Sequence, residues 1–144
     1  MINTENRQLL EGIYKSAKTG MDAAQTVLRK ADDPSFVPVL EELHDGYRLT
    51  AKEAGMRLAK KDTLAEENTK IIKIISWGTI QLNTLSDTTA SNIAGVMMGG
   101  SSAGIKEAAK LLKNNDGADE EAKCLCRNFI SQEQRNIEKL KGFL

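Results

Sequence analysis

Prolines and aromatic residues are scarce in this chain of 144 residues: there are two prolines, and 4% of the residues are aromatic. Between the turns Ala, Leu, Lys and Glu dominate, and these residues favour helix over strand. The sequence therefore predicts an all-α fold, and its length fits a single domain with one core, residues 1–144.

Net charge is absent as well, because Lys plus Arg and Asp plus Glu both total 20. Such a balance creates no field that would draw the chain to nucleic acid or to an anionic membrane surface. The amino terminus has no basic region followed by an apolar run, so no secretory or transit signal is recognisable. We expect a cytoplasmic location, without nucleic acid or membrane partners.

Groups for catalysis are few. The single histidine, His44, would have to be the base of any nucleophilic triad, and no Gly-x-Ser-x-Gly motif accompanies it. Gly99-Gly100-Ser101-Ser102 lacks the Gly-Lys-Ser/Thr ending of a phosphate loop. Cys124 and Cys126 point roughly 200° apart on a helix, which predicts one buried and one exposed thiol rather than a metal or redox motif. We expect no enzymatic activity.

Apolar residues recur at alternating spacings of four and three in four long segments, as in helical bundles. The predicted helices cover residues 4–31, 35–61, 87–113 and 118–142. Residues 63–86 are predicted to form a helical crossover that begins at the capping box Thr63-Leu64-Ala65-Glu66. A long connection between two helical hairpins is typical of ferritin-like four-helix bundles, which is the fold that we predict.

Glu133 and Asn136 fall near the centre of the apolar stripe of residues 118–142, Glu133 within roughly 20° of it. A ferritin-like di-metal site needs inward glutamates on two helices and Glu-x-x-His on the other two. Glu41-x-x-His44 has the right spacing, but Glu41 points roughly 130° away from its stripe. The inward groups are too few for a metal pair.

Two interpretations of Glu133 remain open. A buried carboxylate needs hydrogen-bond donors, and Tyr14, Tyr47 or His44 could supply them. Alternatively, Glu133, His44 and Asn136 form a reduced single site for iron, manganese or zinc. Under the first interpretation no cofactor is expected.

Small residues recur every four positions at Ser91, Gly95, Gly99 and Ala103. This spacing lets two helix backbones approach closely. The segment is too polar to span a membrane, so we interpret it as tight packing inside the bundle, with self-association or room for a small ligand as the alternatives. Because close approach of two helices would leave no volume for a larger side chain, we expect Gly99→Leu to disrupt packing or assembly. Trp77 is interpreted as the residue that anchors the crossover to the bundle.

The order of these segments, with Ile75-Ser76-Trp77-Gly78, Met98-Gly99-Gly100 and the stretch from Leu49 to Leu58, resembles a bacterial family of ferritin-like four-helix proteins of unknown function. The resemblance covers nearly the whole chain. It implies a bundle that keeps the ferritin-like topology without an intact metal site, and it transfers no functional residues. Our leading hypothesis is a non-catalytic module that binds a protein partner or a small apolar ligand and forms a homo-oligomer, namely a dimer.

Overall fold

The computed structural model describes residues 3–60 and 82–144, and these residues contain helices and no strand. The four long helices are α1 (Thr4–Leu28), α2 (Val37–Lys60), α5 (Ala90–Asn114) and α6 (Glu120–Lys141). The fold is an all-α four-helix bundle, as predicted. Most of the predicted crossover, including Trp77, lies outside the described residues. Of its last five residues, 82–86, which are described, residues 82 and 83 are helical.

The predicted helix bounds are wrong by up to three residues, and capping explains two of the differences. Thr89, rather than Asp87, caps α5, because its Oγ1 accepts a hydrogen bond from the Asn92 amide at 3.3 Å. Asp119 caps α6 in the same way, accepting from the Ala122 amide at 2.9 Å. Each helix therefore begins directly after a side chain that satisfies a free backbone N–H group.

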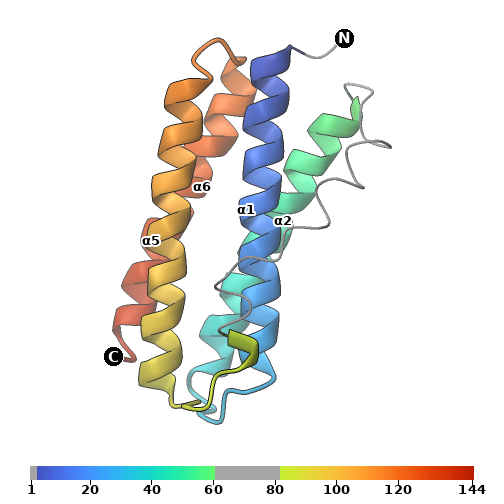
Figure 1. The fold of residues 1–144 in the computed structure, drawn as a ribbon. Helices are drawn as coiled ribbons and strands as arrows, with labels where there is room; N and C mark the ends of the chain where they lie inside the picture. Colours follow the sequence, from blue (N-terminus) through green and yellow to red (C-terminus); the bar gives the residue numbers. More distant parts are fainter. Residues whose placement is uncertain (1–2, 61–81) are drawn as a thin grey trace.

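The direction of each helix can be followed in Figure 1. α1 and α2 run antiparallel, as do α5 and α6, and the two hairpins meet along α1 with α5 and along α2 with α6. α2 and α5 run in the same direction, so α2 ends at the opposite end of the bundle from the start of α5. The connection between them must therefore span the length of the bundle.

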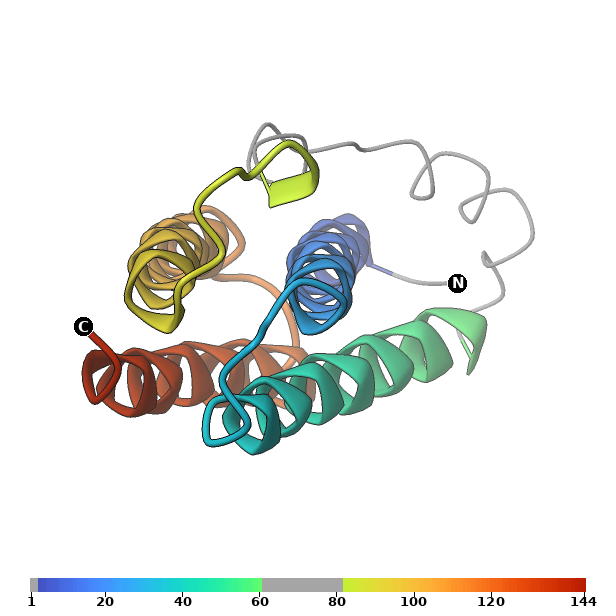
Figure 2. The same cartoon turned by 90° about the horizontal axis from the view of Figure 1, so that it is seen from below.

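Viewed from below, α1 and α5 form one layer and α2 and α6 the other (Figure 2). The inward stripes of the four helices meet between these layers, because each helix must remove its apolar face from water. The largest fully buried apolar side chains are Phe36, Phe129, Leu9, Ile13, Leu40, Leu43, Leu58, Ile93 and Leu140.

Each end of the bundle is closed by contacts between helices distant in sequence. At one end, the Asn6 Nδ2 donates to Asp119 Oδ2 at 2.6 Å, and the Asp119 amide donates back to Asn6 Oδ1 at 2.5 Å. At the other end, the rings of Phe36 and Phe143 lie 4.5 Å apart. Among the described helices, none combines the length and the apolar character needed to cross a membrane.

Candidate functional site

Glu133 lies in the buried stripe of α6, together with Phe129, Asn136 and Leu140. These residues follow one another at spacings of four, three and four, so they share one face of the helix. The Glu133 and Asn136 side chains are each 3% exposed. Both point inward, as the periodicity predicts.

Three uncharged groups donate hydrogen bonds to the same oxygen of Glu133, Oε1. The Tyr47 hydroxyl of α2 lies 2.5 Å from it, the Asn136 Nδ2 lies 3.0 Å from it, and the Ser101 hydroxyl of α5 lies 3.1 Å from it. The Tyr47 and Ser101 oxygens are 3.4 Å apart. Of the three residues considered as partners from the sequence, Tyr47 is the one that meets the carboxylate. We call these four residues, Tyr47, Ser101, Glu133 and Asn136, the Glu133 cluster.

The Tyr47 ring reaches the cluster across a glycine of α1. A Cβ at Gly20 would lie 2.6 to 2.7 Å from three atoms of the ring, so any larger residue there would push Tyr47 away. On its other side the ring packs against Phe129, with a centroid distance of 6.4 Å. Gly20 therefore gives Tyr47 the room to reach α6.

A second glycine makes room for the other carboxylate oxygen. A Cβ at Gly104 of α5 would lie 2.6 Å from Glu133 Oε2. Real Cβ atoms do not approach other heavy atoms so closely, so Gly104 lets α5 and α6 pack with the carboxyl group between them. All four helices thus contribute to the cluster or to the space that it fills.

The electrostatics of the cluster follow from its burial. Burial raises the pKa of Glu133, and the hydrogen bonds from Tyr47, Asn136 and Ser101 oppose this shift without cancelling it. Burial, together with the adjacent Glu133, also raises the pKa of Tyr47. Tyr47 therefore keeps its proton and acts as a donor to Glu133.

The structure does not bring His44 to the cluster. The His44 side chain is 24% exposed, and its Nδ1 lies 3.9 Å from Asp45 Oδ1. Glu41 is exposed, in agreement with its predicted direction. Across residues 3–60 and 82–144, no group of three or more His, Cys, Asp or Glu side chains could hold a metal ion. One carboxylate surrounded by three uncharged donors does not fit a ferritin-like di-metal centre.

The interpretation of the small residues on α5 as tight packing inside the bundle is wrong. Ser91, Gly95, Gly99 and Ala103 are all exposed. Among the described residues, a Cβ at Gly99 or Gly100 would meet nothing within 4 Å. The buried face of α5 lies on the opposite side of the helix, through Ile93, Ala94, Met97, Ser101 and Ala108. The small residues therefore form an outer surface.

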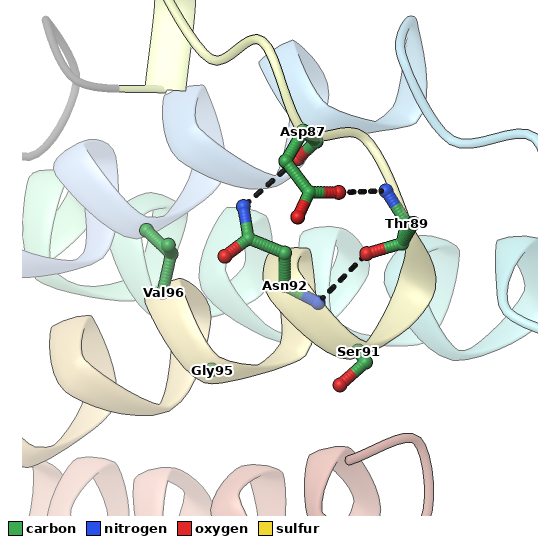
Figure 3. Close-up of a pocket in the computed structure, with 6 residues that line it drawn as sticks. All are labelled: Asp87, Thr89, Ser91, Asn92, Gly95 and Val96. Atoms are coloured by element: carbon green, nitrogen blue, oxygen red, sulfur yellow. Dashed lines mark hydrogen bonds between the residues drawn. The ribbon is translucent and has the colours of Figure 1, made fainter.

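An open depression of about 390 Å³ lies beside the first turns of α5 (Figure 3). Three of its polar lining residues, Asp87, Thr89 and Asn92, form hydrogen bonds with one another at the start of α5. Asp87 Oδ1 accepts from the Thr89 amide at 3.1 Å, and Asn92 Nδ2 donates to the Asp87 carbonyl at 2.8 Å. Because these bonds hold the start of α5, the depression gives no support to a site for a small apolar ligand.

The prediction for the two cysteines is confirmed: Cys124 is exposed and Cys126 is buried. The Cys126 thiol donates to the Ala108 carbonyl, with sulfur and oxygen 3.3 Å apart. Burial raises the pKa of Cys126 to about 11. Cys126 is therefore a packing residue that joins α5 to α6.

Sequence reasoning missed the role of Gly20, predicted close helix packing at Gly104 without connecting it to Glu133, and gave Ser101 no role in a site. The positions of Ser101 and Gly104 in the helix could have indicated these roles, because Ser101 falls on the buried stripe of α5 and Gly104 lies beside it. A polar or very small residue next to a core stripe marks a place where a partner helix inserts a larger group. Which group is inserted depends on how the helices pair.

The comparisons with known proteins agree with the fold. No protein-family model matches the chain, and no curated protein sequence is significantly similar to it. The chain is similar to the crystal structure of a DUF305 fragment from Deinococcus radiodurans, with a TM-score of 0.72 over 97% of this chain and 95% of that chain. The two sequences are 13% identical, so the likeness shows a shared four-helix fold alone.

Proposed function

We propose that this chain is a non-catalytic ferritin-like bundle that acts as an interaction module and forms a homodimer through the exposed side of α5. The ferritin-like topology is supported by the parallel directions of α2 and α5, since the end of α2 and the start of α5 lie at opposite ends of the bundle (Figure 1).

One observation carries the proposal: between Ala90 and Ile105, the exposed residues of α5 are small and uncharged. We define the α5 outer face as Ser91, Gly95, Gly99, Ser102 and Ala103, all of which are exposed. No charged residue occurs from Thr88 to Ile105, although 28% of the chain is charged. Leu144, which is 65% exposed, lies next to this face, with its Cδ2 3.9 Å from the position of a Cβ at Gly95.

The partner that best fits the α5 outer face is the same face of a second copy of this chain. Two outer faces carry no like charges that would repel each other, and their glycines allow close approach of the backbones. If the two α5 helices cross antiparallel at Gly99, Lys110 lies about 16 Å from the crossing point, and the start of the partner's α5 lies about 14 Å from it on the same side. The exposed Lys110 and the partner's exposed Asp87, which precedes that start, then lie at the same end of the interface.

The mass of the protein in solution, measured over a range of concentrations, tests this dimer. The wild-type chain is expected to sediment as a dimer and Gly99→Leu as a monomer, because a leucine would separate the two helices. Ala59→Leu is the control, since Ala59 is exposed on α2 and lies outside the α5 outer face. A wild-type chain that stays monomeric, or a Gly99→Leu variant that still dimerises, would contradict the proposal.

A charge exchange tests the orientation of the two helices. Lys110→Asp and Asp87→Lys are each expected to weaken the dimer, because like charges would then meet across the interface. The double variant restores opposite charges and is expected to recover most of the lost affinity. Recovery would not occur if the helices crossed in parallel, because Lys110 would then be far from the partner's Asp87.

Metal analysis separates the proposal from the metal-binding alternative around Glu133 and His44. Protein purified without chelator is expected to carry less than stoichiometric iron, manganese and zinc. Stoichiometric metal that disappears in a Glu133→Ala variant would favour the alternative.

A further inference from the structure

The inner face of α5 combines larger side chains, Ile93 and Met97, with several small ones. Several of its inward positions carry small side chains, namely Ala94, Ser101, Gly104 and Ala108. Helices fix their relative position by fitting the side chains of one between those of the other, and small side chains provide shallow ridges. Apolar burial is also non-directional. The small positions around Ser101 and Gly104 therefore contribute little to fixing where α6 lies along α5.

The Glu133 cluster distinguishes one position of α6 from the others. In the observed register Glu133 lies opposite Ser101 and Gly104, which supply a donor and a space. A slip of one helical turn, about 5.4 Å, would move the carboxyl group toward Met97 or Ala108. Both of these residues are buried and apolar, so they offer no donor for a buried carboxyl group.

The same slip would separate Glu133 from α2. The Tyr47 hydroxyl reaches Glu133 because Gly20 lets the ring pass, and this hydrogen bond joins the first hairpin to the second. The Asn136 amide moves with Glu133, since both are on α6. Three helices are thus held in one mutual register by two donors, the Tyr47 hydroxyl of α2 and the Ser101 hydroxyl of α5, which meet at a single oxygen atom of α6.

We infer that Glu133 is a positioning residue that locks the register of α6 against α5 and α2. The role requires an acceptor at this position and does not require a negative charge. This inference is independent of the proposed dimer, because it concerns contacts inside one chain.

Spin labels can measure the register directly. Cys124 of α6 is exposed and can be labelled, whereas Cys126 is buried and has a pKa raised to about 11. A second label is placed on α5 by Ser102→Cys, at an exposed position. The distance between the labels is expected to show one narrow distribution in this labelled parent, recorded in dilute protein to exclude pairs between molecules. Cys124→Ser controls for labelling of Cys126.

Two substitutions at Glu133 then decide the inference. Glu133→Gln keeps an acceptor of the same shape and is expected to preserve the narrow distribution. Glu133→Leu removes the acceptor and is expected to broaden it or to add a second population displaced by about one helical turn, 5.4 Å. An unchanged, narrow distribution in folded Glu133→Leu would overturn the inference, and so would broadening in Glu133→Gln.

A double variant covers the case in which Glu133→Leu does not fold. Tyr47→Phe with Ser101→Ala removes the two donors from the other helices and keeps nearly all of the side-chain volume. If Glu133 fixes the register of α6, the distance distribution between the labels should broaden in this variant as well. A narrow distribution at the wild-type distance would show that packing alone sets the register and would overturn the inference.

Discussion

Gly99 and Gly104 lie five residues apart on α5 and show how differently the two sides of one helix use the same residue. A Cβ at Gly104 would lie 2.6 Å from Glu133 Oε2, whereas a Cβ at Gly99 would meet nothing within 4 Å. Gly104 is required by the packing of α5 against α6. Gly99 is not required by any contact among residues 3–60 and 82–144.

The difference teaches that a run of small residues has no single meaning. Glycine costs a helix about 1 kcal/mol relative to alanine, so each glycine in α5 weakens that helix. On the inner side the cost is offset by the contact between helices around Glu133. On the outer side no contact among the described residues offsets it at Gly99, and this supports our proposal that the α5 outer face contacts a second copy.

The largest effect is expected from Gly104→Leu. The new side chain would displace the Glu133 carboxyl group and leave Tyr47, Ser101 and Asn136 without their acceptor. We expect a loss of about 3 kcal/mol or more in the free energy of unfolding. Urea denaturation measures it. A loss below about 1 kcal/mol would show that α5 and α6 can separate at this point at little cost.

Tyr47→Phe is expected to have a smaller effect. It removes one of three donors to Glu133 and preserves the ring that packs against Gly20 and Phe129. The expected loss is about 1 to 2 kcal/mol, the cost of a buried acceptor with one fewer partner. Tyr14→Phe is a suitable control, because Tyr14 is a partly buried tyrosine on α1. Equal losses in both variants would contradict a special role for the Tyr47 hydroxyl.

Stability should also depend on pH through Glu133. Its pKa is raised in the folded state, so its contribution is fully present below the unfolded pKa and is lost as pH rises through the folded pKa. Relative to Glu133→Gln, the wild-type free energy of unfolding should fall with rising pH, by at most about 1.4 kcal/mol per pH unit. Glu138→Gln, at an exposed position on α6, should follow the wild-type profile. Parallel profiles for wild type and Glu133→Gln would refute the prediction.

The smallest effect, of opposite sign, is expected from Gly99→Leu in the monomer. Leucine favours helix over glycine and meets no neighbour here, so the free energy of unfolding should rise by about 0.5 to 1 kcal/mol. The measurement requires dilute protein, so that any dimer is dissociated. A loss of stability under these conditions would mean that Gly99 has an intramolecular contact, and the contrast with Gly104 would then fail.

The helices and the inward direction of Glu133 and Asn136 could be predicted because they depend on local periodicity. The same periodicity placed Glu41 outside and separated Cys124 from Cys126. It could not show which of several aromatic or histidine side chains meets Glu133, because Tyr14, Tyr47 and His44 differ in their positions only after the hairpins pair. The expected packing role of Gly99 failed for a related reason: small residues permit close approach without specifying the partner.

The sequence by itself determined an all-α chain with four amphipathic helices and one carboxylate in an apolar stripe, because helix propensity and a 3.6-residue period act over short distances along the chain. The tertiary structure alone decided that Tyr47, Ser101 and Asn136 surround that carboxylate and that Gly20 and Gly104 make space for the cluster. It also decided that the α5 outer face is exposed. These outcomes depend on how α5 is rotated and positioned against α1 and α6, and that arrangement is set by contacts between residues far apart in the chain.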